Sequence, residues 1–209
     1  MKKEMDKLKS KIKTSKKFTI FLVVLLLVGV VAGTLFITIL SSTDKSLVKE
    51  YMNSYMSSIE KDKINYLALF CNSFLKEFLI ASVIWLLGIS IVGIPAILFL
   101  FFKEAFVLGF SIGSLLFVYK GKGLLYALFY IFPCQILNII AYGILLMYAL
   151  SVSMKMIEAV FKHKTIDFKT IMGKYSKVLG IVLILFLVSS LLETFLLPNI
   201  LKWLLSIIK

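Results

Sequence analysis

Long apolar stretches separated by short polar segments dominate this 209-residue chain. A helix needs about 20 apolar residues to cross the roughly 30 Å hydrocarbon core of a bilayer. Residues 78–154 hold three such stretches, broken at Pro95 and Pro133. The pattern predicts an all-α, polytopic membrane bundle of about five helices, with spans at residues 18–40, 78–102, 105–119, 124–154 and 178–197. The third stretch is short, because 15 residues reach only about 22 Å.

The composition changes the picture only by excluding other classes. Sixty per cent of the residues are hydrophobic, 17% are charged, and the mean hydropathy is +0.99. Soluble domains carry about 45–50% apolar and about 25% charged residues. All 24 basic residues are lysine. The absence of arginine argues against bidentate recognition of phosphate and base edges, although a genome biased toward lysine codons is the explanation we favour. The net charge of +13 is distributed around apolar spans, so we expect no nucleic-acid partner.

The distribution of lysine predicts the orientation in the membrane. Residues 1–17 hold eight lysines and two acidic residues, and residues 155–177 hold six and two. Residues 41–77 hold five lysines and five acidic residues. The positive-inside rule then places the first two segments in the cytoplasm and the third outside. Five spans put the C-terminus outside. The basic segments should also attract anionic lipid headgroups, by about 1 kcal/mol per lysine.

The first apolar stretch has a competing interpretation as a secretory signal peptide. Lys16 and Lys17 precede it, and residues 30–32 read Val-Val-Ala, which resembles a cleavage site. The apolar run nevertheless continues through Leu40, beyond the usual 7–15 residues of a signal peptide. We interpret it as an uncleaved anchor.

The external segment 41–77 predicts a helical hairpin. Apolar residues recur at spacings of three and four over 47–59 and again over 67–78, with a charged turn at 60–63 between the two runs. Tyrosine is enriched at binding surfaces and methionine adapts to varied partners. Four residues of the first run are therefore candidates for docking a partner: Tyr51, Met52, Tyr55 and Met56. Any amphipathic helix beside a membrane can instead lie in the headgroup layer or on top of the bundle, and we favour this alternative.

Residues 198–209 similarly predict an interfacial helix anchored by Trp203.

Small residues predict where helices approach closely. Gly29 and Gly33 form a GxxxG pattern in the first span, and Ala105, Gly109 and Gly113 form two overlapping small-xxx-small steps in the third. Such spacing brings helix backbones together. We expect these residues to pack helices within one bundle.

Polar groups inside spans are functional candidates by default. Gln135 and Asn138 lie on one helical face just after Pro133. Lys103 and Glu104 are predicted to form a local ion pair at the turn between the second and third spans. The breaks at Pro95 and Pro133 resemble the discontinuous helices of transporters, although no inverted repeat is visible.

Patterns that carry catalysis or metal binding are absent from the sequence. There is no GxSxG, HExxH or P-loop signature, and one histidine and two cysteines are too few for a zinc site. His163 lies between two lysines and is predicted to be solvated. Cys71 and Cys134 are predicted at different depths, so no disulfide is expected. We expect no enzyme activity, no cofactor and no metal.

The stretch from Phe70 to Gly113 resembles the stage II sporulation protein M family. It reads FCNSFLKEFLIASVIWLLGISIVGIPAILFLFFKEAFVLGFSIG. The residues that carry the resemblance are the pair Asn72-Ser73, Gly88, Gly93 and the run Phe106–Ser111. Two positions depart from the family pattern, in which position 104 is often glycine and the turn at 133 tends to read Pro-Gln-Asn. Here they are Glu104 and Pro-Cys-Gln, so neither position is given a role.

The resemblance implies a non-enzymatic protein of the engulfment machinery of endospore-forming bacteria. In that family the protein holds stage II sporulation proteins P and D, which degrade septal peptidoglycan, at the mother-cell membrane. The residues by themselves indicate a five-span bundle with an external hairpin. The alternative function is a small-solute channel or transporter, indicated by the broken helices.

Overall fold

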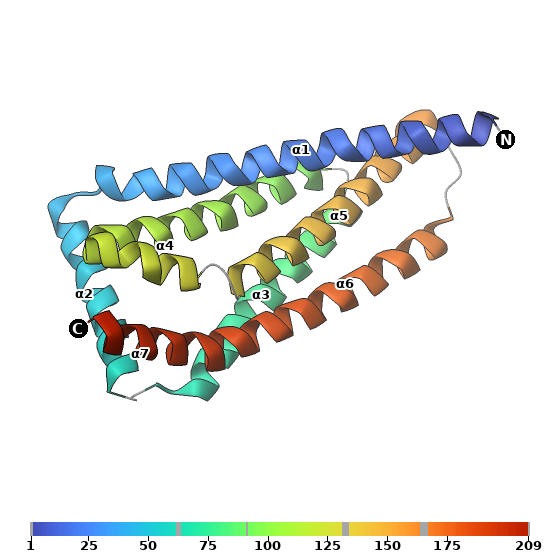
Figure 1. Cartoon of the computed structure of the whole chain (residues 1–209). Helices are drawn as coiled ribbons and strands as arrows, with labels where there is room; N and C mark the ends of the chain where they lie inside the picture. Colours follow the sequence, from blue (N-terminus) through green and yellow to red (C-terminus); the bar gives the residue numbers. More distant parts are fainter. Residues whose placement is uncertain (1, 62–63, 91, 131–133, 164–166, 209) are drawn as a thin grey trace.

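A computed structural model of the chain (Figure 1) describes residues 2–61, 64–90, 92–130, 134–163 and 167–208. Every regular element in these ranges is helical, which confirms the all-α prediction. The elements in chain order are α1 (Lys2–Ile39), α2 (Ser42–Glu60), α3 (Tyr66–Ile89), α4 (Gly93–Tyr130), α5 (Ile136–Lys162), α6 (Phe168–Leu191), a π-helical segment (Leu192–Leu196) and α7 (Leu197–Ile208).

Five helical runs are long and apolar enough to cross a membrane, as predicted: Lys16–Ile39, Tyr66–Ile89, Gly93–Phe129, Ile136–Phe161 and Phe168–Ser206. The chain is a multi-pass membrane protein. The second run begins earlier than the sequence pattern predicted, because Asn65 caps α3 by accepting a hydrogen bond from the backbone N–H of Ala68 at 3.1 Å. The helix then continues through Lys76 and Glu77 into the apolar stretch.

The turn between the second and third spans also lies elsewhere than predicted. Helix α3 ends at Ile89 and α4 begins at Gly93, so Lys103 and Glu104 lie inside α4 and not at a turn. Pro95 lies in the first turn of α4. A proline at this position removes no helical hydrogen bond, since the first N–H groups of a helix have no partner within it. The boundary between α3 and α4 therefore lies a few residues before Pro95, which belongs to the first turn of α4. Pro133 is outside the described residues.

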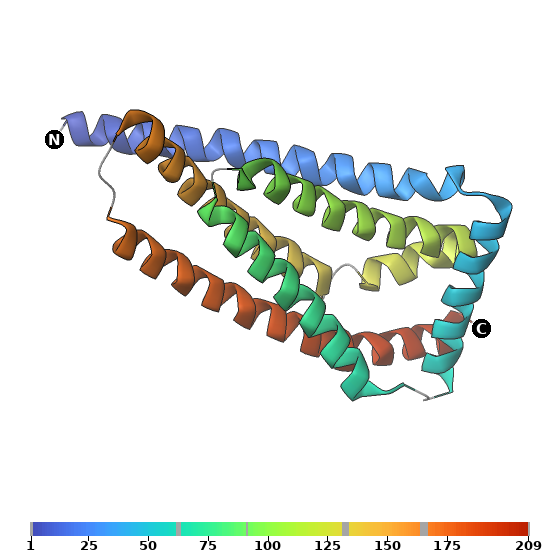
Figure 2. The same ribbon diagram turned by 180° about the vertical axis from the view of Figure 1, so that it is seen from behind.

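The two ends of the bundle differ in what they hold (Figures 1 and 2). The N-terminus and the connection between α5 and α6 lie at one end, and α2, α7 and the C-terminus lie at the other. Helix α2 runs across this second end. The two lysine-rich segments thus share an end, as the positive-inside interpretation requires. Which end faces the cytoplasm stays a prediction.

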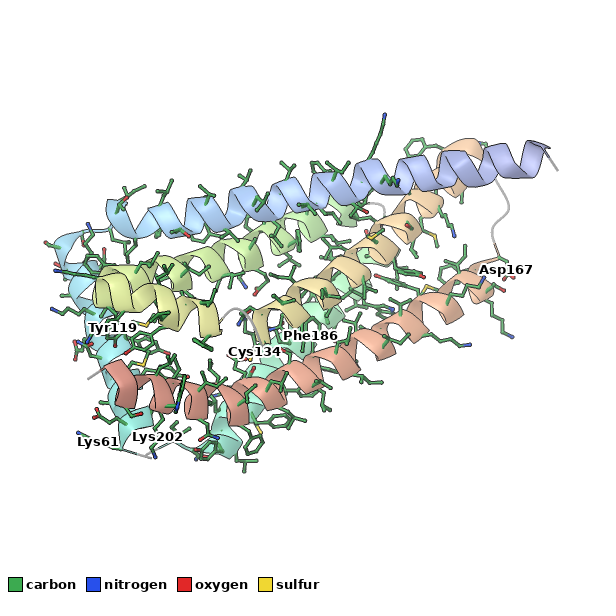
Figure 3. The ribbon with its side chains drawn as sticks, in the orientation of Figure 1. Lys61, Tyr119, Cys134, Asp167, Phe186 and Lys202 are labelled. Atoms are coloured by element: carbon green, nitrogen blue, oxygen red, sulfur yellow. The ribbon has the colours of Figure 1, made fainter. Side chains whose placement is uncertain are left out.

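Helix α4 reverses direction at the α2 end. Lys120 has φ 50° and ψ −126°, outside the helical range. Residues 93–119 run toward α2, and residues 121–130 run back toward the middle of the bundle, where α5 continues the same direction (Figure 1). The chain thus returns from the α2 end in two helices, the last part of α4 and then α5, and Cys134, shortly before α5, lies near the middle of the bundle (Figure 3).

The main apolar core lies between α3, α4, α5 and α6. Its fully buried members include Ile84, Ile97, Leu145 and Phe186. A second buried cluster, at the α2 end, joins Met56 and Ile59 of α2 to residues of α4 and to three leucines of α7: Leu197, Leu201 and Leu204. Helix α7 thus packs on α2 and α4, continuing α6 beyond the π-helical segment. Trp203, on another face of α7, is 58% exposed.

Candidate functional site

Four charged residues meet where the middle of α3 lies against the first third of α4. Lys76 and Glu77 come from α3, and Lys103 and Glu104 come from α4; we call these four residues the charge cluster. Lys76 Nζ lies 3.6 Å from Glu77 Oε1 and 3.2 Å from Glu104 Oε2. Lys103 Nζ lies 2.9 Å from Glu104 Oε1. Glu104 thus accepts from both lysines and links the two helices.

A third helix joins the charge cluster through Glu77. The Tyr142 hydroxyl of α5 donates a hydrogen bond to Glu77 Oε2. Glu77 is 5% exposed and Tyr142 is 3% exposed. Burying a carboxylate away from water is costly unless it is paired and hydrogen-bonded. Lys76 and Tyr142 together meet that requirement.

The lysines of the charge cluster are more exposed than the glutamates. The Lys76 and Lys103 side chains are 49% and 47% exposed, against 7% and 11% for Glu77 and Glu104. Their helix faces also carry Leu79 and Phe99, which are 60% and 67% exposed. A lysine at the centre of a span costs about 2.5–3.5 kcal/mol on insertion scales. Pairing with the buried carboxylates offsets part of that cost.

The sequence predicted the ion pair between Lys103 and Glu104, which the structure confirms, but it did not reveal that Lys76 and Glu77 join them. Both Lys-Glu pairs flank the apolar run 78–102, and charges at the two ends of an apolar run ordinarily mark membrane boundaries. The sequence held one signal that these pairs lie inside helices of the bundle. Residues 66–75, before the first pair, and residues 105–119, after the second, are themselves mostly apolar.

The predicted intramembrane candidates lie next to this site. Asn138 is 5% exposed, and its Oδ1 atom has no hydrogen-bond partner in the described part of the chain. It lies one turn before Tyr142 on α5. Gln135 is half-buried just before α5 begins. Close by, Ser189 of α6 donates a hydrogen bond to the Cys134 carbonyl at 3.0 Å, which satisfies a buried backbone oxygen at the break.

The predicted docking residues of α2 line a pocket of about 250 Å³, which we call the α2 pocket. Tyr51 is 69% exposed, Met52 and Tyr55 are half-buried, and Met56 is 6% exposed. Most of this stripe therefore faces the bundle, and Tyr51 reaches its outside. The rest of the lining comes from α3, α4, the π-helical segment and α7: Leu69, Ser111, Leu115, Tyr126, Glu193, Leu197 and Leu201.

Glu193 supplies the carboxylate of the α2 pocket. Ser73 of α3 donates a hydrogen bond to its Oε2 atom at 2.6 Å. Burial, together with the negative charge of Glu193, raises the pKa of the Tyr55 phenol to about 12. The Tyr55 hydroxyl therefore stays protonated, and uncharged, at physiological pH.

Tyr119 of α4 fastens α2 over the pocket. Its hydroxyl lies 3.1 Å from the Met52 carbonyl oxygen, to which it donates, and 3.2 Å from Asn53 Oδ1. The Tyr119 ring meets the Tyr126 ring edge to face, with centroids 5.3 Å apart. Figure 3 shows Tyr119 at the α2 end of the bundle.

The small residues of α1 and α4 meet in one interface, the α1–α4 seam. A Cβ atom added to Gly109 would lie 2.0 Å from the Val30 carbonyl oxygen, and one added to Gly33 would lie 2.0 Å from the Phe106 carbonyl oxygen. Ala105 and Gly113 face Gly29 and Thr34 in the same way. The Thr34 hydroxyl donates to the Gly109 carbonyl at 3.0 Å. The two backbones therefore leave no room for a side chain at Gly33 or Gly109.

The described residues hold no group of three or more histidine, cysteine, aspartate or glutamate side chains placed to bind a metal ion. Cys71 is exposed and Cys134 is buried, and both are free thiols. His163 is exposed at the end of α5. The site's chemistry in the described ranges therefore lies in its carboxylates, lysines and phenols.

Comparison with family models matches residues 18–198 to the family described as Stage II sporulation protein M. Comparisons with curated proteins and with solved structures gave no match. The matched range runs from the beginning of the apolar part of α1 to the beginning of α7, and it includes the charge cluster, the α1–α4 seam and the stripe of α2. Because the match covers most of the chain, the protein belongs to the stage II sporulation protein M family.

Proposed function

We propose that the protein is a non-enzymatic membrane scaffold of the engulfment machinery, holding stage II sporulation proteins D and P in the mother-cell membrane at the sporulation septum. The observation that carries the proposal is the family match over residues 18–198. The helical architecture supports it, because an interlocked bundle offers fixed surfaces on which partners assemble.

The proposed docking surface is the outward face of α2. Leu47 and Tyr51 are 58% and 69% exposed on a helix that runs across the end of the bundle. A few aromatic anchors carry most of the energy of a typical interface. Met56 is buried, so it supports α2 from beneath, and Tyr51 with the edge of Tyr55 makes the contact.

Co-purification of the hydrolases tests this surface. The double substitution Tyr51→Ala and Tyr55→Ala should lower recovery of proteins D and P several-fold, without lowering the amount of inserted scaffold. Tyr148→Ala is the matched control, since Tyr148 is 47% exposed on α5, away from α2. Undiminished recovery with the double variant would move the docking surface to the spans.

The scaffold also requires α2 to lie outside the cell membrane. In a background with Cys71 and Cys134 replaced by alanine, an impermeant thiol reagent should label Lys61→Cys and leave Lys169→Cys unlabelled in intact cells. Both positions are exposed, at opposite ends of the bundle. The reverse labelling would invert the orientation and remove α2 as a docking surface for external hydrolases.

A second candidate function is small-solute or ion transport. The charge cluster favours it, because ionisable residues at mid-span mark ion or proton pathways in many transporters. The division of this part of the chain between α4 and α5 favours it as well, as does the buried Asn138 oxygen, which has no hydrogen-bond partner among the described residues. Protein-dependent, ion-selective flux in proteoliposomes, lost in Glu104→Gln, would establish transport and leave the scaffold as an incomplete description.

A further inference from the structure

The α2 pocket combines one carboxylate with aromatic and thioether side chains. Tyr51, Tyr55 and Tyr126 line it together with Met52, Met56 and Glu193. Its remaining lining is aliphatic apart from Ser111. At about 250 Å³ the pocket accepts a small group and not a large ligand.

The carboxylate of Glu193 is hydrogen-bonded but forms no ion pair within the described ranges. In the described ranges its one hydrogen bond comes from the neutral hydroxyl of Ser73, and no lysine lies within ion-pair distance. Lys76, one turn from Ser73 on α3, is held by Glu77 and Glu104 instead. The pocket therefore presents a carboxylate that forms no ion pair with a lysine in the described part of the chain.

Aromatic rings around a carboxylate favour positively charged ligands. The face of a tyrosine ring is electron-rich and attracts an ammonium group placed over it. The pocket draws its tyrosines from two elements, because Tyr51 and Tyr55 come from α2 and Tyr126 from the returning part of α4. Tyr126 is 3% exposed and stacks edge to face on Tyr119, so its position is fixed before any ligand arrives.

We infer that the α2 pocket binds an ammonium group carried on a short apolar stem. Glu193 neutralises the charge, the tyrosines surround the ammonium, and the methionines and leucines contact the stem. The lysine side chain and the ethanolamine headgroup of a lipid share this chemistry. The inference does not depend on the scaffold function.

The charge requirement separates this inference from simple filling of an apolar pocket. Choline and its neutral isostere 3,3-dimethylbutan-1-ol have the same shape and differ in the charge of one atom. We expect the full-length chain in detergent to bind choline at least about tenfold more tightly than the isostere in calorimetric titration, a difference of about 1.4 kcal/mol. Equal affinity for the two compounds, or no binding of choline, would overturn the inference.

Two variants test the residues. Glu193→Gln keeps an acceptor for Ser73 but removes the charge, and it should abolish the preference for choline. Glu50→Gln removes an exposed carboxylate of α2 that does not line the pocket, and it should leave the preference unchanged. Tyr51→Leu changes a side chain that is 69% exposed, so folding is preserved, and it should weaken choline binding by about two- to fivefold. Full choline affinity in Glu193→Gln would contradict the assignment.

The source of the ammonium group is decided by two further probes. N-acetyl-lysine methylamide represents a lysine side chain, and dihexanoyl phosphatidylethanolamine represents a lipid headgroup. A phosphate close to Glu193 is repelled, so we expect the lysine probe to bind more tightly. Tighter binding of the lipid probe, lost in Glu193→Gln, would support the pocket and assign it to the membrane; binding of neither probe would overturn it.

Discussion

Helix α4 meets its neighbours in two different ways. Toward α1 it presents Ala105, Gly109 and Gly113, and the two backbones touch. Toward α3 it presents Glu104, which forms an ion pair with Lys76 of α3 and a second one with its own neighbour Lys103. The hydrophobic effect does not drive helices together inside a lipid bilayer, so close van der Waals packing and polar contacts must do so. This helix uses one device on each side.

The two interfaces should respond to substitution in different ways. The α1–α4 seam depends on the absence of side-chain atoms, so it is broken by adding volume. The charge cluster depends on complementary groups, so it is broken by removing one of them. The following substitutions test that contrast, beginning with the largest expected effect.

Gly109→Leu should be the most damaging substitution. An added Cβ would already lie 2.0 Å from the Val30 carbonyl oxygen, so the helices must separate along the seam. We expect a loss of about 3 kcal/mol or more, at the upper end of overpacking costs, measured by unfolding in detergent. Gly180→Leu is the control, because a Cβ there meets nothing within 4 Å. Equal stability of Gly109→Leu and the parent would contradict the seam.

Glu104→Gln should have an intermediate effect. The substitution keeps the side-chain volume but removes the carboxylate that pairs with both lysines. Lys76 then keeps only Glu77, and Lys103 keeps no carboxylate of the charge cluster. Hydrogen bonds to charged groups contribute about 1.5–3 kcal/mol each. Because both lysines are about half exposed, we expect a net loss of only about 1–2 kcal/mol. The control is Glu50→Gln, on the exposed side of α2. If Glu104→Gln and the parent have the same free energy of unfolding, the charge cluster does not join α3 to α4.

Tyr142→Phe should have the smallest effect. It removes the hydroxyl that donates to Glu77 while keeping the ring, which packs on Phe186 with centroids 4.8 Å apart. We expect a loss of about 1 kcal/mol, the usual net contribution of one hydrogen bond. Tyr148→Phe on the exposed face of α5 should change nothing. If the two variants unfold identically, the hydrogen bond from Tyr142 to Glu77 does not stabilise the bundle.

The sequence predicted the small-residue interface of α4 better than its charged interface. The small residues of α1 and α4 were identifiable because a spacing of four places them on one helical face. Their mutual contact required the structure, which alone pairs Gly33 with Phe106 and Gly109 with Val30. The ion pair between Lys103 and Glu104 was predicted, but its link to Lys76 of α3 was missed, because a charge inside a span and a charge at its boundary look identical along the chain.

Hydropathy does not locate the ends of helices, which is why the boundaries near Pro95 and Tyr66 differ from the predicted ones. Hydropathy places a span by its most apolar residues, whereas the structure places a helix end by its cap, and Asn65 does so for α3. The π-helical continuation from α6 into α7 has no periodic signal either. The number of spans was predictable because it depends on how many separate apolar stretches the chain holds.

Recovery of the hydrolases with the full-length chain is the most direct test of the scaffold function. The tagged protein is solubilised from sporulating cells in mild detergent, and stage II sporulation proteins D and P are quantified in the eluate, with an unrelated tagged multi-pass membrane protein as control. The scaffold function predicts enrichment of both hydrolases over the control. Recovery of neither above the control level, from cells in which both are present, would contradict it.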